Sequence, residues 1–177
     1  MRTGLILFAG LMLTAISCTK EDRKLTLIRQ EEAIDQFVQT LTKDTVFYRN
    51  GVVRAVLEQG LPTGQGDTLA PGDTVYFYYA GHIFSKGKGE LFYTNSDSVA
   101  LSYNRTLEME EAHVRQGVVG EGLFLKGLDN GFPGMAPGEH AYIIFNADYG
   151  FGNTQVGLVP AMSPLLFEIW IERIVKN

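Results

Sequence analysis

The sequence lacks most of the residue patterns on which catalytic and metal sites are built. It has one cysteine and three histidines, and His82, His113 and His140 have no cysteine or carboxylate at ligand spacing. No intrachain disulfide can form, and neither a metal nor another cofactor is expected. There is no G-x-S-x-G motif, and the glycine-rich stretch at 117–122 lacks the Lys-Ser/Thr pair of a phosphate loop. Nucleophilic hydrolysis and phosphate-loop chemistry therefore have no candidate residues.

Clusters of basic residues are also missing. The chain has 15 Lys and Arg against 20 Asp and Glu, which gives a formal net charge of −5. An acidic chain without a basic patch argues against a nucleic-acid partner and against electrostatic docking on an anionic bilayer. We also find no internal repeat and no low-complexity tract.

No apolar run is long enough to span a bilayer, which takes about 20 residues. The longest run near the start, residues 4–16, has the length and the flanks of a secretory signal peptide, so we assign residues 1–17 to one. The residues around Cys18 resemble a bacterial lipobox, in which the cysteine becomes the lipidated first residue of the mature chain. The acyl chains would then anchor the protein without spanning the membrane. An ordinary signal peptide with an incidental cysteine is the alternative.

The residues that follow Cys18 are polar and predict a lipidated tether over residues 18–29. Thr19-Lys20-Glu21-Asp22 resembles the tag that directs some Bacteroidetes lipoproteins to the cell surface. We therefore expect an outer-membrane lipoprotein that faces the periplasm or the cell surface.

Residues 30–71 are predicted to form an extension made of a helix and a hairpin. Apolar residues recur at spacings of three and four between residues 28 and 41, which indicates an amphipathic helix. Residues 45–57 read as two short strands about Asn50-Gly51, the strongest two-residue hairpin signal. Residues 60–72 are rich in glycine, threonine and proline and predict a loop.

The rest of the chain predicts an antiparallel sheet and one short helix. Alternating aromatic and β-branched residues indicate strands at 73–84, 90–94, 140–146 and 165–175. Residues 123–130 suggest a short helix, and residues 96–121 fit either a helix or an inserted loop. Pro160 and Pro164 stand in front of the last strand and make a stiff, apolar loop there. The expected fold class is α+β, with a twisted antiparallel sheet around one short helix.

Six motifs in this region resemble those of the FKBP-type peptidyl-prolyl isomerases, in the same order. They are the segments Gly72–Gly81, Leu91–Asn95, Phe124–Leu128, Gly134–Glu139, Asp148–Gly150 and Leu158–Ile169. The resemblance assigns residues 72–177 to an FKBP-like isomerase domain whose pocket lies between the sheet and the short helix.

The resemblance also implies the residues of the site. Four would be catalytic: Tyr149, Phe92, Tyr79 and Phe167. Five would bind substrate: Phe124, Leu125, Leu128, Leu158 and Val159. The backbone N–H of Leu125 and the hydroxyl of Tyr149 would donate to ligand carbonyls, since Tyr149 stands in a loop after a strand, where a half-exposed hydroxyl is free.

Two residues depart from the family pattern. Tyr93 stands in place of an aspartate and Leu128 in place of a tryptophan, so only weak macrolide binding is expected. The implied activity is isomerisation of X-Pro bonds in exported polypeptides, which assists their folding in the cell envelope and needs no nucleophile. A non-catalytic peptide-binding chaperone or an envelope assembly lipoprotein is the alternative, and residues 96–121 could bind an envelope partner in either case.

Overall fold

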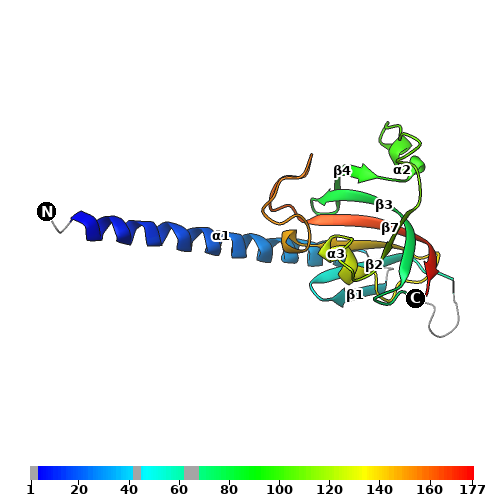
Figure 1. Cartoon of the computed structure of the whole chain (residues 1–177), viewed down its shortest axis with the longest axis horizontal. Coiled ribbons are helices and arrows are strands. Elements are labelled where there is room, and N and C mark those ends of the chain that lie inside the picture. The colour runs from blue at the N-terminus through cyan, green and yellow to red at the C-terminus, as the bar shows by residue number, and fades with distance from the viewer. Residues whose placement is uncertain (1–3, 42–44, 62–67) are drawn as a thin grey trace.

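The computed structural model describes the backbone of residues 4–41, 45–61 and 68–177, with side chains from residue 20 onward. Figure 1 shows a long helix that packs against a curved sheet with only its C-terminal part. In chain order the elements are α1 (Gly4–Thr40), β1 (Thr45–Arg49), β2 (Val52–Glu58), β3 (Thr74–Phe84), β4 (Lys88–Thr94), α2 (Asp97–Ser102), β5 (Arg115–Val118), α3 (Lys126–Gly131), β6 (His140–Phe145), the 3-10 turn η1 (Ala147–Tyr149) and β7 (Leu165–Val175).

The strands form one antiparallel sheet in the order β1-β2-β6-β7-β3-β4, and β5 pairs with β3 as well. The long strands β3 and β7 pair from Thr74↔Val175 to Ile83↔Leu165 and form the centre of the sheet. The predicted α+β class, with an antiparallel sheet and a short helix lying on it, is confirmed.

The predicted hairpin is present and belongs to this same sheet. Asn50 and Gly51 both have positive φ, 48° and 78°, which is the conformation that a two-residue type I′ turn requires. The hairpin brings β2 alongside β6, with Val52 opposite Phe145 and Val53 opposite Ile144. The segment predicted as an extension therefore contributes two strands to the main sheet.

Two predicted segments differ from the structure. The helix expected from residue 28 begins at Gly4 and passes through residues 18–29, because the Lys, Glu, Arg and Leu there are good helix formers. Residues 107–117, one possible helix by composition, instead form turns and the start of β5. Pairing of β5 with β3, from Phe77↔Arg115 to Thr74↔Val118, overrides the local preference.

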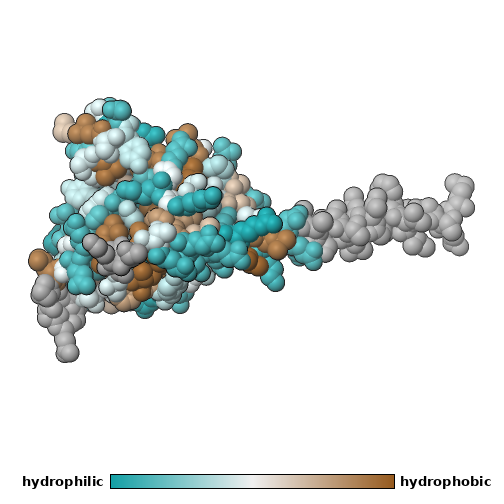
Figure 2. All heavy atoms as spheres, turned by 180° about the vertical axis from the view of Figure 1, so that it is seen from behind, coloured by the Kyte–Doolittle hydropathy of each residue, from teal (hydrophilic) through white to brown (hydrophobic). Residues whose placement is uncertain are grey.

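The helix α1 carries mainly hydrophilic side chains on the surface that faces solvent from residue 20 onward (Figure 2). Within the described residues, no helix combines the length and the apolar character needed to cross a bilayer.

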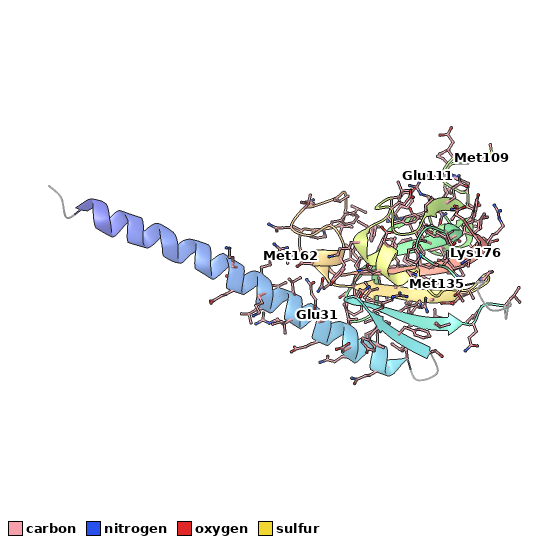
Figure 3. The ribbon with its side chains drawn as sticks, turned by 60° about the horizontal axis from the view of Figure 1, so that its bottom comes forward. Glu31, Met109, Glu111, Met135, Met162 and Lys176 are labelled. Atoms are coloured by element: carbon pink, nitrogen blue, oxygen red, sulfur yellow. The ribbon has the colours of Figure 1, made fainter. Side chains whose placement is uncertain are left out.

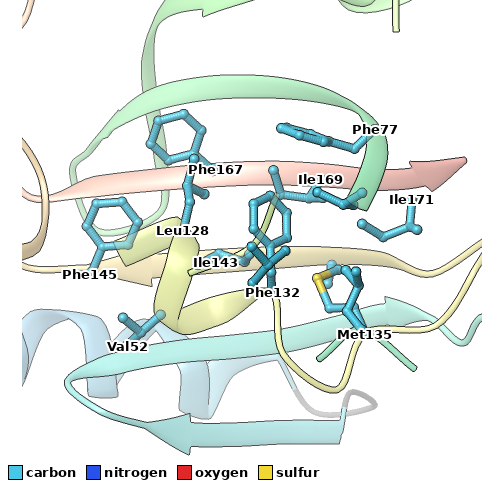
Figure 4. Close-up of a cluster of buried hydrophobic side chains, with 14 of the residues drawn as sticks. Val52, Phe77, Leu128, Phe132, Met135, Ile143, Phe145, Phe167, Ile169 and Ile171 are labelled. Atoms are coloured by element: carbon cyan, nitrogen blue, oxygen red, sulfur yellow. The ribbon is translucent and has the colours of Figure 1, made fainter. Parts of the chain in front are cut away.

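Two groups of buried apolar side chains lie on opposite faces of the sheet. The larger one fills the space between the sheet and α3 and includes Phe77, Phe132, Met135, Ile143 and Ile169 (Figure 4). The smaller one lies between the sheet and the C-terminal part of α1 and consists of Ile34, Val38, Val53, Phe84, Ile144 and Leu166. The amphipathic pattern that predicted the helix thus marks the face that covers the sheet.

The helix α3 lies unusually close to β6 because glycines occupy its contact face. A Cβ on Gly127 would collide with the ring of Phe145, and one on Gly131 would lie 2.5 Å from Cγ2 of Ile143. Both neighbours are buried and fully packed, so they cannot move aside cheaply. The two glycines therefore fix how deeply α3 sits on the sheet.

We expect Gly127→Ala to lower the free energy of unfolding by about 1–3 kcal/mol, because an added methyl overpacks this contact. Helix propensity alone would favour alanine by about 1 kcal/mol, so the two effects have opposite signs. Urea unfolding of the full chain measures the change. Gln36→Ala, at an exposed position of α1, is the control and should be near neutral. A stabilised Gly127→Ala variant would show that the close packing is not a constraint.

Candidate functional site

A pocket of about 510 Å³ opens between α3 and the concave face of the sheet. Its walls come from β3, β4, β5 and β7, from α3 and the segment that leads into it, and from the loop between η1 and β7. The lining residues are Phe77, Tyr79, Phe92, Tyr93, Arg115, Leu123, Phe124, Leu125, Leu128, Phe151, Val156, Gly157, Leu158 and Phe167.

Aromatic rings in edge-to-face contact form the interior of the pocket. Phe92 meets Phe167 with ring centroids 5.8 Å apart at 85°, and Phe77 meets Phe124 at 5.6 Å and 73°. Gly81 makes room for this arrangement, because a Cβ there would lie 2.6 Å from Cζ of Phe92. The result is an apolar surface of interlocked rings. Figure 4 shows Phe77, Phe167 and Leu128 on the three elements that enclose this space.

The polar groups of the pocket are few. Tyr79 stacks on Tyr93 with ring centroids 5.8 Å apart, and no hydrogen bond to either hydroxyl is found within the described ranges. Burial, followed by the nearby Tyr93, raises the pKa of Tyr79 to about 12. Its hydroxyl therefore remains a neutral donor at all physiological pH values.

A backbone donor stands at the entrance to α3. Leu125 precedes the helix with φ −57° and ψ 143°, and its carbonyl accepts the first bonds of the helix from Leu128 and Asp129. Its own N–H makes no hydrogen bond to any described residue. An unpaired N–H beside an apolar pocket can donate to a carbonyl of a bound ligand.

Seven of the nine predicted pocket residues line this space together. They are Tyr79, Phe92, Phe124, Leu125, Leu128, Leu158 and Phe167. Val159 does not, because it is 1% exposed and packs into the core, where it exchanges two backbone hydrogen bonds with Val156. The neighbouring Leu158 is 58% exposed at the mouth of the pocket instead.

Tyr149 also lies outside the pocket, contrary to the sequence-based expectation of a free hydroxyl there. Its ring end and hydroxyl lie against Gly51 of the hairpin turn, and Lys126 Nζ sits 4.6 Å from the ring centroid. The pocket is lined by Phe151, whose ring meets Phe92 at 6.3 Å and 71°. The sequence offers two aromatic-glycine pairs two residues apart, Tyr149-Gly150 and Phe151-Gly152, and the second pair enters the pocket. Because Phe151 has no hydroxyl, the pocket has one donor fewer than expected.

Several lining residues were missed by the sequence analysis: Phe77, Arg115, Leu123, Phe151, Val156 and Gly157, together with Tyr93, which was noted only as a departure. Phe77 shares a strand face with Tyr79, so the period of two along β3 was a usable signal. Arg115 had no such signal, since its position depends on the long-range pairing of β5 with β3.

A glutamine of α1 holds both ends of the loop that carries Phe151 and Leu158. Gln30 is 9% exposed; its Nε2 donates to the Met162 carbonyl at 2.7 Å, and its Oε1 accepts from the Ala147 N–H at 2.9 Å. The Met162 N–H in turn donates to the carbonyl of Gly152 at 2.8 Å. Figure 3 shows Met162 beside α1, near the position of Glu31. We call this arrangement the Gln30 clasp.

Loss of the clasp should loosen the pocket wall. We expect Gln30→Ala to destabilise the chain by about 1–3 kcal/mol, since it leaves the buried Ala147 N–H unpaired. Hydrogen exchange should quicken at the Ala147 amide, which loses its acceptor, and at the Met162 amide, whose bond to the Gly152 carbonyl depends on the loop keeping its conformation. The exposed Gln36→Ala of the same helix should change neither measurement. Unchanged exchange at Met162 in Gln30→Ala would mean that the loop keeps its conformation without α1.

Among the described residues, no group of three His, Cys, Asp or Glu side chains is placed to hold a metal ion.

Comparisons with known proteins agree on one family. Residues 66–172 match the family model described as FKBP-type peptidyl-prolyl cis-trans isomerase. FK506-binding protein 1 of Aspergillus oryzae is 29% identical over 126 residues, which cover 70% of this chain and 98% of the relative. A peptidyl-prolyl cis-trans isomerase of Schizosaccharomyces pombe is 32% identical over 96 residues, or 49% of this chain and 86% of the relative.

A solved structure supports the fold. The crystal structure of the three FKBP domains of wheat FKBP73 superposes with a TM-score of 0.61 at 19% identity, over 76% of this chain and 52% of that one.

Proposed function

This chain belongs to the FKBP-type peptidyl-prolyl cis-trans isomerase family, and from that premise we propose that the aromatic pocket isomerises X-Pro bonds in exported polypeptides. The observation that carries the proposal is the combination of an apolar interior with two unpaired donors, the Leu125 N–H and the Tyr79 hydroxyl. Peptidyl-prolyl isomerase activity itself follows from the family and from the named relatives.

The chemistry requires no nucleophile. Rotation about an X-Pro bond crosses a barrier of about 20 kcal/mol, because the twisted amide loses its resonance. The twisted state carries less charge separation than the planar one, so an apolar pocket favours it relative to water. A pocket that binds the twisted state better than either planar state lowers the barrier.

We assign roles to the side chains on this basis. Phe92 and Phe167, whose rings touch edge to face, form one surface against which the proline ring packs, and Leu128 closes the space beneath it. The Leu125 N–H donates to the carbonyl of the residue on one side of the bond, and the Tyr79 hydroxyl donates to the rotating carbonyl. Phe151 contributes an apolar wall. Tyr149 supports the hairpin and takes no part in binding.

Macrolide binding is proposed as weak. The name of the Aspergillus oryzae relative states that it binds FK506. In this pocket Tyr93 supplies no carboxylate at the mouth, and Leu128 offers a smaller, non-aromatic floor, so such a ligand has fewer contacts here.

The location is a separate proposal. The apolar run before Cys18 and the polar residues after it support a signal peptide of residues 1–17 and a lipidated Cys18 that anchors the protein to the outer membrane. The clients would then be proline-containing polypeptides that have left the cytoplasm. The periplasmic face and the cell surface are both open to a protein with this anchor.

Isomerase assays on substituted variants should show that the pocket residues contribute to activity and that Tyr149 does not. In a coupled assay on a short Ala-Pro peptide, we expect Phe92→Ala to lower kcat/KM roughly tenfold through loss of an aromatic contact. Tyr79→Phe should lower it about fivefold, which corresponds to one hydrogen bond.

The matched control is Tyr149→Phe, which removes a hydroxyl that lies outside the pocket and should leave the rate unchanged. A loss in Tyr149→Phe equal to that in Tyr79→Phe would refute the assignment of donors. A folded wild-type chain that binds the peptide without accelerating its isomerisation would instead identify a peptide-holding chaperone, the alternative that Phe151 and Leu128 favour.

The anchor is tested by Cys18→Ala in a bacterial host that lipidates such signals. The wild-type chain should sediment with membranes, and mass spectrometry of its N-terminal peptide should show an acylated Cys18. The variant should be soluble after cleavage or remain with an unprocessed N-terminus. A wild-type chain that is cleaved but carries no acyl group would refute the lipid anchor and favour an ordinary signal peptide.

A further inference from the structure

One charged side chain stands among the lining residues of the pocket, and it is Arg115. It belongs to β5, opposite Phe77 of β3, and because it lines the pocket and is exposed, we place it at the rim rather than in the interior. The other described lining residues are aromatic or aliphatic, apart from Gly157, so the pocket contains no carboxylate. An arginine in such a setting has no built-in counter-charge.

The guanidinium also finds no partner elsewhere in the described chain. It takes part in none of the salt bridges, which join Arg23 to Asp148, Arg54 to Glu139, Lys88 and His140 to Glu168, and Lys176 to Asp73. No hydrogen bond or cation-π contact involves its side chain. The acidic residues of its own segment do not reach it either: Glu111 accepts from the Glu108 N–H instead.

The groups around Arg115 do not neutralise it. Tyr79 also lines the pocket, and its pKa of about 12 keeps its hydroxyl protonated, although the charge of Arg115 acts to lower that pKa. Tyr93 at the mouth brings no carboxylate. Arg115 therefore places a positive potential at the entrance of a pocket in a chain whose net charge is −5.

We propose that Arg115 is a specificity-determining residue that selects X-Pro substrates with an Asp or Glu side chain next to the proline. The inference rests on the proposed function of the pocket and adds the class of substrate that it prefers. The proline ring fills the apolar interior, so the exposed guanidinium at the mouth meets a flanking residue rather than the ring.

The chemistry of the guanidinium suits this role. Its planar fork can donate two parallel hydrogen bonds to a carboxylate, which a lysine cannot do with the same geometry. The surrounding rings exclude water on one side and strengthen the attraction relative to an open surface. The same field disfavours a substrate with lysine beside its proline.

Two sets of peptides test the proposal on the full chain. In one set the residue before proline is Glu, Gln or Lys, and in the other set the residue after proline varies in the same way. We expect kcat/KM for the Glu peptide to exceed that for the Gln peptide about fivefold in at least one set, the upper range for a partly exposed ion pair. The Lys peptide should be the poorest, and added salt should reduce the differences.

Variants assign the preference to Arg115. The Glu/Gln ratio should fall to about one in Arg115→Gln, and Arg115→Glu should invert the order so that Lys is preferred. Arg105→Gln, at an exposed position of the same segment outside the pocket, is the matched control and should keep the wild-type ratio. Ratios within one variant cancel any general loss of activity.

The outcomes separate this inference from the proposed function. An Ala-Pro peptide that the wild-type chain isomerises, with no Glu preference in either set or with a preference that persists in Arg115→Gln, would overturn the role of Arg115 alone. If no peptide is isomerised, the proposed isomerase activity of the pocket is refuted. Fluorescence anisotropy of the same labelled peptides then decides the Arg115 preference from the ratio of their Kd values.

Discussion

The close contact between α3 and β6 is the constraint on which the pocket depends. Gly127 and Gly131 let the helix lie against Phe145 and Ile143 at a depth that no side chain would permit. Leu125 stands at the start of this helix and Leu128 lies within it. The packing of α3 on the sheet therefore sets both the position of this pocket wall and the direction of the Leu125 N–H. A helix held further from the sheet would widen the pocket and turn its backbone donor away.

The opposite wall depends on β3, which pairs with β4, β5 and β7. Gly81 on this strand lets the Phe92 ring cross over it, and Phe77 and Tyr79 extend the aromatic surface along it. The third wall is a loop, and loops need support to hold an apolar surface in place. Here the support comes from α1, through the two hydrogen bonds of Gln30 to Met162 and Ala147. The three walls are thus held by glycine contacts, by strand pairing and by a buried side chain.

The sequence predicted those features that depend on local chemistry. Asn50-Gly51 marked the hairpin, because few other residues adopt positive φ twice in succession, and the apolar run after Pro164 marked the last strand from Leu165 to Val175. The order of the motifs led to the pocket and to seven of its residues.

The sequence near residue 150 could not show that Phe151 rather than Tyr149 lines the pocket. Both are aromatic residues before a glycine, and only the path of η1 decides which one faces the pocket. Arg115 and Gln30 were missed for a related reason. Their roles come from partners on distant strands and loops, and no pattern within their own segments indicates them.

The place of β2 in the sheet has a consequence for how this protein can be divided. The match to the family begins at residue 66, whereas β2 ends at Glu58 and lies between β1 and β6. A fragment cut at the start of that match would expose the backbone N–H and C=O groups of β6, next to the buried Ile143 and Ile144. An open strand of this kind is a template for pairing with other chains, so such a fragment would be prone to aggregate. The unit expected to fold without an open β6 edge is therefore larger than the segment that matches the family model, and it includes the hairpin.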